Sequence, residues 1–190
     1  MESVAPRSFV KAILKTGVRG AAASGAAAAL ASLLQNGHAA RPINAIAHIY
    51  DGGHPPPHDG NGRRNTLLGA GIHTAASVWW AAFYELALAL QRPERRWRTA
   101  GALSAVAYVV DYYVVNQRFR PGFEKYLSPG AMLAVYAALA AGYALSGNRP
   151  GKRGAIVGER QHQRKRAALP RLARQPQLAA EQAGQLAADR

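Results

Sequence analysis

The sequence predicts an all-α fold: an integral membrane bundle of four transmembrane helices followed by a disordered basic C-terminal tail. Apolar stretches long enough to cross a bilayer, such as residues 66–90, alternate with short charged runs. Most of the 24 Lys and Arg residues flank those stretches or lie in the tail, where orientation signals and contacts with anionic lipids are found. Because the charges are clustered, the near-neutral mean hydropathy of the whole chain conceals its apolar spans.

The N-terminal segment, residues 1–19, is predicted to be basic and amphipathic. Lys11, Lys15 and Arg19 recur every fourth residue and therefore form one stripe on a helix. We expect this stripe to contact anionic lipid and to orient the first span, which is predicted at about residues 17–35. A cleaved signal peptide is the alternative interpretation, because a basic leader precedes an Ala-rich stretch.

The connection after the first span combines turn-forming residues with histidines. Arg41-Pro42 begins a short helical stretch that reaches Tyr50, and Asn44 and His48 share one of its faces. A Pro- and Gly-rich stretch that is typical of turns follows. Histidines near carboxylates can bind zinc, copper or nickel, so four residues form a candidate metal site: His48, Asp51, His54 and His58. Their spacing matches no specific metal signature, and a polar loop is the other interpretation.

The next two spans are predicted at about residues 66–90 and 99–115, and their short basic link makes them antiparallel neighbours. Ser128-Pro129 pairs a helix N-cap with a proline at the first helical position and predicts the fourth span at 129–146. Residues 147–190 are basic and polar, so we expect a disordered tail. Lys and Arg are most frequent in the N-terminal segment, the second loop and the tail, which predicts that both termini are cytoplasmic.

Three ionisable residues fall inside the predicted spans: His73, Glu85 and Asp111. Such residues are costly in hydrocarbon and are therefore functional candidates. Glu85 lies near the end of its span, where a snorkelling or capping carboxylate is expected. His73 and Asp111 are expected at similar depth on neighbouring helices, where they could form a proton relay, part of a metal site or a structural contact between helices.

The sequence also excludes several classes of function. It contains no cysteine, so disulfides and thiolate metal sites are absent. It contains no phosphate-binding glycine loop, nucleophile elbow or HExxH helix, and we therefore expect no catalytic residues and no cofactor. The basic residues flank apolar runs and are not interleaved with stacking aromatics, so we expect no nucleic-acid partner.

Four segments carry a resemblance to a known family: residues 43–48 (INAIAH), 73–85 (HTAASVWWAAFYE), 107–112 (AYVVDY) and 120–124 (RPGFE). They resemble a family of small, uncharacterised proteobacterial inner-membrane proteins, some of which are labelled sodium:proline symporter. The resemblance covers roughly residues 20–145. It implies a four-helix bundle in the bacterial inner membrane, assigns no catalytic residue, and singles out His48, His73, Glu85 and Asp111.

Three functions are compatible with these observations. We expect a non-enzymatic subunit or stabiliser that associates through its helices, either with a second copy or with another membrane protein, because small residues line the helix faces. A small ion or proton pathway that uses His73 and Asp111 is the alternative. The third function is a metal-binding protein or membrane-embedded enzyme that uses the His/Asp cluster around His48 and Asp51.

Overall fold

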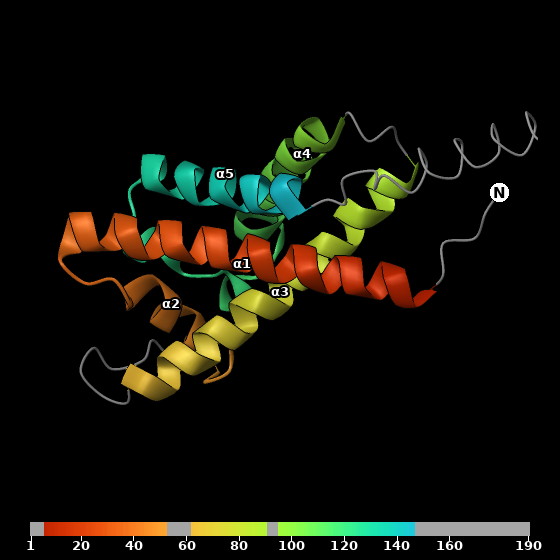
Figure 1. Ribbon diagram of the computed structural model, residues 1–190. Coiled ribbons are helices and arrows are strands. Elements are labelled where there is room, and N and C mark those ends of the chain that lie inside the picture. Colours follow the sequence, from red (N-terminus) through yellow and green to blue (C-terminus); the bar gives the residue numbers. More distant parts are fainter. Residues whose placement is uncertain (1–5, 53–61, 91–94, 147–190) are drawn as a thin grey trace, which may run out of the picture. The chain divides into compact units, whose positions relative to one another are not determined.

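The computed structural model describes residues 6–52, 62–90 and 95–146, and within them all regular structure is helical (Figure 1). The main helices are α1 (Pro6–Asn36), α2 (Arg41–Ile46), α3 (Gly62–Leu90), α4 (Arg96–Val109) and α5 (Pro129–Ser146). Short turns complete the described structure: η1 (Ala47–Ile49), η3 (Val110–Val114), η4 (Gln117–Phe119) and η5 (Phe123–Lys125). The all-α prediction is confirmed for these residues, whereas the predicted tail at 147–190 lies outside them.

Helix α1 is one uninterrupted helix of 31 residues, so from Pro6 onward the basic segment and the first predicted span are a single element. Its Ala-rich sequence explains this continuity, since alanine has the highest helix propensity and lysine and arginine are also good helix formers. The helix ends where Gly37 adopts a left-handed conformation, with φ of 72°. The amide of Gly37 donates to the carbonyl oxygen of Leu33 (2.9 Å), as expected for a glycine that terminates a helix.

Helices α1 and α5 lie side by side and run in opposite directions (Figure 1). Their antiparallel register is fixed where α1 ends and α5 begins. The Gln35 side chain donates to the Ser128 hydroxyl (3.1 Å) and accepts from the Ser128 amide (3.0 Å), and the Asn36 side chain donates to the Tyr126 carbonyl (2.6 Å). The Ser128 hydroxyl also accepts from the amide of Ala131 (3.4 Å), which confirms the predicted N-cap.

Glycines allow the helices to approach one another closely. A Cβ atom added to Gly142 of α5 would lie 2.8 Å from the Cα of Gly20 in α1. One added to Gly17 of α1 would lie 2.5 Å from the Cα of Val78 in α3, and one added to Gly69 of α3 would collide with the carbonyl oxygen of Ile43 in α2. These contacts are typical of small-residue interfaces between transmembrane helices, in which backbones pack against each other directly.

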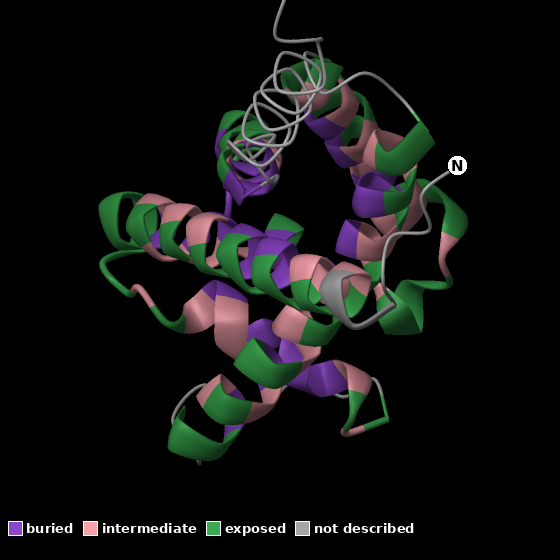
Figure 2. Ribbon diagram, turned by 45° about the vertical axis from the view of Figure 1, so that its right-hand side comes forward, coloured by how far each residue is buried: buried purple, intermediate pink, exposed green. Residues whose placement is uncertain are grey.

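The buried residues lie on the faces that the helices turn toward one another (Figure 2), and many large apolar side chains are exposed. Tyr84 and Tyr143 are the largest fully buried side chains, and their rings are 5.5 Å apart. In contrast, Leu34 is 77% exposed, Leu90 80% and Trp79 64%. So many exposed large apolar side chains call for an apolar environment or partner around the bundle.

Two helices of the described residues are long and apolar enough to cross a membrane, judged by length and composition: Phe9–Asn36 within α1, and α5. The other two predicted spans are not among them. Helix α3 has 29 residues, but its histidine, glutamate and hydroxylated or indole side chains lower its average hydropathy. Helix α4 has only 14 residues before its geometry changes, which is short for a hydrocarbon core of about 30 Å at 1.5 Å per residue.

Helix α4 continues as a π-helical turn, η3, over Val110–Val114. The amide of Val115 donates to the carbonyl oxygen of Val110 (2.9 Å), which is the five-residue spacing of a π-helix. The predicted third span, residues 99–115, therefore exists as helix but changes its winding after Val109. Single π-turns of this kind occur frequently at functional sites.

Candidate functional site

A cavity of about 100 Å³ lies between α1, α3 and α5 and is bounded by α2, η1 and the segment that joins η3 to η5. It has room for several water molecules, since one water needs only about 10–15 Å³ measured in the same way. Its polar wall consists of Ser24, His73, Ser77, Trp80, Asp111 and Tyr136. Isoleucine, valine, leucine and phenylalanine side chains form most of the remaining wall. The cavity therefore joins residues from four separate helical segments in one polar site.

His73 lies on α3 and faces α1. Its Nε2 is 3.0 Å from the hydroxyl oxygen of Ser24. The same hydroxyl lies 2.8 Å from the carbonyl oxygen of Gly20, to which it can donate. The imidazole ring lies 6.0 Å from the ring of Phe123.

Asp111 lies in the π-turn η3. Its Oδ2 accepts a hydrogen bond from the hydroxyl of Tyr136 on α5 (2.7 Å), and the Trp80 side chain of α3 also lies within hydrogen-bonding reach of this carboxyl group. The carbonyl of Tyr136 accepts in turn from the Ser104 hydroxyl of α4 (2.5 Å). The carboxyl group of Asp111 is therefore fixed by donors from two other helices, which offsets part of the cost of burying it.

His73 and Asp111 line the same cavity, as their predicted depths suggested, but each takes its hydrogen-bond partner from another helix. Ser24 holds the imidazole and Tyr136 holds the carboxyl group. His73 and Asp111 therefore line one polar cavity, which leaves room between the helices for a third group.

Glu85 is buried within the bundle, with 8% of its surface exposed, whereas a snorkelling carboxylate would be exposed at the protein surface. Its Oε1 accepts a hydrogen bond from the Thr16 hydroxyl of α1 (2.5 Å). Glu85 is buried because α1 includes the basic N-terminal residues of the chain. Thr16 and Gly17 of α1 therefore pack against the C-terminal half of α3. Glu85 therefore contributes to the contact between α1 and α3.

Asn44 lies in α2, and His48 lies in the adjoining turn η1. The Asn44 side-chain oxygen accepts from the Thr66 hydroxyl of α3 (2.6 Å). His48 is buried, and its Nδ1 lies 2.5 Å from the carbonyl oxygen of Ala45, one turn earlier. Asn44 thus joins α2 to α3, whereas His48 contacts the backbone of its own segment.

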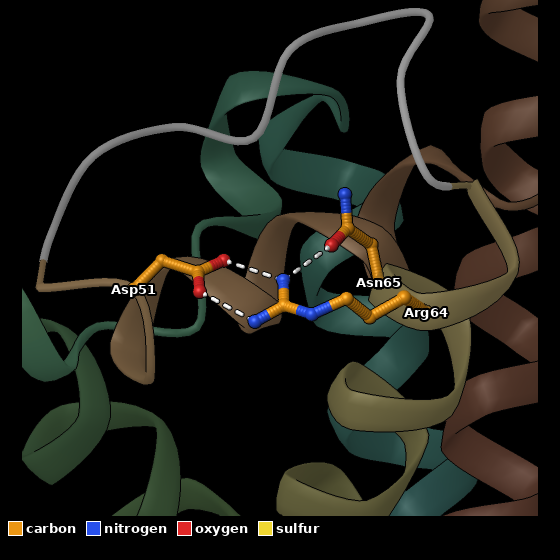
Figure 3. Close-up of polar contacts among 3 residues, drawn as sticks. All are labelled: Asp51, Arg64 and Asn65. Atoms are coloured by element: carbon orange, nitrogen blue, oxygen red, sulfur yellow. Dashed lines mark hydrogen bonds and ion pairs between the residues drawn. The ribbon is translucent and has the colours of Figure 1, made fainter.

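Asp51 forms an ion pair with Arg64 at the start of α3 (Figure 3). The two carboxylate oxygens accept from the guanidinium group at 2.9 and 3.2 Å, and the same group reaches the side-chain oxygen of Asn65 at 3.4 Å. The hydrogen bond from Arg64 holds the pKa of Asp51 below its ordinary value. Asp51 is therefore engaged by a cation of the chain itself.

The described part of the chain contains no group of three or more His, Cys, Asp or Glu side chains that could hold a metal ion. Of the candidate metal ligands, His48 contacts its own backbone and Asp51 contacts Arg64. The remaining two, His54 and His58, lie outside the described residues.

The basic stripe of α1 is exposed along its whole length, at Lys11, Lys15 and Arg19. A parallel row of aliphatic side chains lies beside it and is about half exposed: Val10, Leu14 and Val18. A helix surface with adjacent aliphatic and basic rows suits the boundary between lipid headgroups and acyl chains.

The sequence did not predict that Ser24, Thr16 and Tyr136 are hydrogen-bond partners of candidate site residues. Hydroxyl residues are ordinary constituents of transmembrane helices, so their types carry little information. A weak signal exists for Tyr136, because Tyr136 and Tyr143 are seven residues apart on one face of an otherwise apolar span.

Comparison of the chain with protein-family models, curated proteins and solved structures gives no match. The family resemblance of the four segments described above therefore stays a prediction.

Proposed function

We propose that this chain is an integral protein of the bacterial inner membrane, with four spans formed by α1, α3, α4 together with η3, and α5. Its proposed role is that of a non-enzymatic helix-bundle subunit or stabiliser, which associates through its helices with a second copy or with another membrane protein. The contact between Gly20 and Gly142 carries this proposal. It joins the two helices that are long and apolar enough to cross a membrane through a small-residue interface.

The directions of the helices support four crossings. Contacts from Thr16 to Glu85 and from Ser24 to His73 make α1 and α3 antiparallel. The contact of Ser104 with Tyr136, together with that of Tyr112 with Met132, makes α4 and α5 antiparallel as well. A bundle whose successive long helices alternate in direction can be inserted with every loop at a membrane surface.

The outer surface of α3 and α4 supports membrane insertion of these two helices. Trp79, Phe83 and Leu86 are exposed on α3, and Val106 and Val109 are exposed on α4. The polar residues of the same helices, such as Ser77 and Ser104, are buried toward the bundle. A bundle that is apolar outside and polar inside suits a lipid environment.

Anionic lipid contacts are supported at two places. One is the exposed stripe of Lys11, Lys15 and Arg19 on α1. The other is a surface groove of about 550 Å³ along α4, where Arg95 and Arg98 precede apolar residues that include Val106. Arginine above an apolar surface matches the phosphate and acyl chain of a lipid.

The topology can be tested cleanly because the native chain contains no cysteine. Single substitutions Tyr50→Cys and Phe119→Cys replace exposed residues on the side predicted to be periplasmic, and Arg95→Cys replaces an exposed residue on the cytoplasmic side. In cells with a permeabilised outer membrane, a membrane-impermeant maleimide is expected to label the first two, and the third only after the inner membrane is disrupted. Equal labelling of all three would contradict the four-span topology.

The subunit role requires a separate experiment. Crosslinking in native membranes, followed by purification in mild detergent, is expected to give a discrete oligomer or one copurifying membrane protein in constant ratio. A chain that remains monomeric and free of partners in both conditions would rule out the proposed role, even if the topology were as expected.

A second candidate function is a small ion or proton pathway, which is favoured by the presence of His73 and Asp111 in one cavity. Such pathways use ionisable residues inside the membrane. Proteoliposomes that contain the native chain are expected to show flux, which Asp111→Asn removes and Glu124→Gln, a change at an exposed carboxylate of η5, leaves intact. Absence of flux, or equal flux in both variants, would contradict this candidate.

A further inference from the structure

The cavity has a charge balance unlike that of the rest of the chain. The whole sequence carries a formal net charge of +14, yet the wall of the cavity contains no Lys or Arg and one carboxylate, that of Asp111. An anion would find a more favourable electrostatic environment at the Lys and Arg residues elsewhere in the chain. The cavity wall offers a positive charge one carboxylate and has no Lys or Arg side chain among its residues.

Aromatic rings form a large part of the same wall. Trp80 and Tyr136 both lie within hydrogen-bonding reach of the Asp111 carboxyl group, so their rings are beside the charge. Phe119 and Phe123 line the cavity from the segment between η3 and α5. The faces of aromatic rings attract cations, and cages of such rings are used to bind methylated ammonium groups.

We propose that this cavity binds a small organic cation of the methylated-ammonium class, with Asp111 as its counter-ion and Trp80, Tyr136, Phe119 and Phe123 as its aromatic wall. The apolar residues of the cavity, among them Ile72 and Leu139, contact the methyl groups. The volume of about 100 Å³ suits a ligand of a few heavy atoms.

A bare metal cation fits this wall poorly, because hard cations require several oxygen ligands. The wall supplies one carboxylate, and its other side-chain oxygens are the hydroxyl groups of Ser24, Ser77 and Tyr136. The Tyr136 hydroxyl donates to Asp111 itself. An organic cation needs only one carboxylate and surrounding rings, and this is what the wall supplies.

His73 is the other titratable group of the wall. A protonated imidazole would repel the ligand, so binding is best measured at about pH 8, above the range in which histidine ordinarily titrates. The proposal does not rest on the subunit role, since it concerns the cavity wall alone. A monomeric chain could still bind the cation, and an oligomer could fail to bind it.

The test uses the full chain in mild detergent and three probes: tetramethylammonium, the neutral tert-butyl alcohol, and sodium ion at matched ionic strength. Calorimetry and tryptophan fluorescence are expected to show saturable binding of tetramethylammonium only. Equal binding of the neutral probe would show that charge plays no part, and equal competition by sodium would show that the rings play none. Either result would overturn the proposal without the use of any variant.

Two variants locate the site. Asp111→Asn removes the charge at nearly constant volume and is expected to weaken binding at least about tenfold, whereas Glu124→Gln, at an exposed carboxylate, is expected to leave it unchanged. Trp80→Leu is expected to weaken binding, whereas Trp79→Leu replaces a neighbour that is 64% exposed and does not line the cavity. Unchanged affinity in a folded Asp111→Asn protein would overturn the proposal.

An ammonium group can belong to a free solute or to a lipid headgroup. Nanodiscs of phosphatidylglycerol, with and without a phosphatidylcholine component, distinguish these sources. Loss of tetramethylammonium binding when phosphatidylcholine is present would identify the headgroup as the ligand. Undiminished binding would identify a free solute.

Discussion

The carboxylate of Glu85 on α3 accepts a hydrogen bond from the hydroxyl of Thr16 on α1, at 2.5 Å, and both residues are buried. The bond joins two antiparallel helices through residues that are 69 positions apart in the sequence. A buried carboxylate without donors is strongly unfavourable, so this hydroxyl both satisfies Glu85 and fixes the position of α1 along α3.

Thr16→Val is therefore expected to destabilise the fold, because it removes the donor at constant shape and leaves the carboxylate buried. The expected loss is about 1–3 kcal/mol, measured by thermal or denaturant unfolding in detergent. Thr74→Val is the matched control, since the Thr74 hydroxyl donates to the Ala70 carbonyl of its own helix. In a double-mutant cycle with Glu85→Leu, which removes both carboxylate oxygens, additive losses would contradict the coupling of Thr16 with Glu85.

Two glycines of α3 differ sharply in their surroundings and provide an internal comparison. A Cβ atom at Gly69 would collide with the Ile43 carbonyl of α2, whereas one at Gly71 would meet nothing within 4 Å. Gly69→Ala is expected to lower stability by about 1–3 kcal/mol through overpacking. Gly71→Ala is expected to raise it by up to about 1 kcal/mol, because alanine favours the helix. Equal unfolding midpoints for the two variants would contradict the close approach of α2 and α3.

The ion pair of Asp51 with Arg64 predicts a pH dependence. The pKa of Asp51 is lowered in the folded chain by the hydrogen bond from Arg64. The stabilisation is therefore complete above about pH 4, where aspartate in the unfolded chain is ionised, and is lost as the pH falls through the lower folded-state pKa. We expect native protein and Asp51→Asn to differ in unfolding midpoint at pH 6 and to converge in strong acid.

High salt should also reduce that difference, because the pair lies at the surface and is screened. The control is Glu124→Gln, which neutralises another exposed carboxylate and is expected to leave the acid dependence of the native chain unchanged. A difference between native protein and Asp51→Asn that grows toward acid would contradict the assignment.

Retention of α1 in the membrane-inserted protein is a further prediction. Its removal would expose Gly142 and Tyr143 of α5 and would leave His73 and Glu85 without Ser24 and Thr16. An N-terminal epitope tag is therefore expected to remain attached in the purified membrane fraction, with an intact mass that includes α1. A mass that corresponds to cleavage near Ala39 or Ala40 would favour the signal-peptide interpretation instead.

The parts of the fold that depend on local signals could be predicted from the sequence. Ser128-Pro129 predicted the start of α5, and the structure begins this helix at Pro129. The sequence predicted helix for the basic stripe and a first span at about residues 17–35, but not that both belong to one continuous helix from Pro6. Hydropathy locates the edge of an apolar run and not the edge of a helix, and lysine and arginine propagate helices well. No local sequence signal predicts the π-turn after Val109, whose side chains Asp111 and Tyr112 contact α3 and α5.

The candidate site could be predicted in part. His73 and Asp111 were found because ionisable residues are conspicuous in apolar spans. Their hydrogen-bond partners, Ser24 and Tyr136, were not predicted. Serine and tyrosine are common residue types, and their role here depends on which helices meet. Glu85 was identified as a candidate, but its location was not foreseen, since the depth to which α1 overlaps α3 is a tertiary property.

The π-turn of η3 determines how far the side chains that follow Val109 are rotated about the helix axis. A π-turn is equivalent to an α-helix with one residue inserted, and one residue rotates a helix by about 100°. Deletion of Val110 would let η3 relax into a regular α-helix and would move Asp111 one position toward α4, with a corresponding rotation about the helix axis. Asp111 would leave the cavity wall although it remained in the chain. The number of residues in this turn thus sets the direction in which Asp111 points.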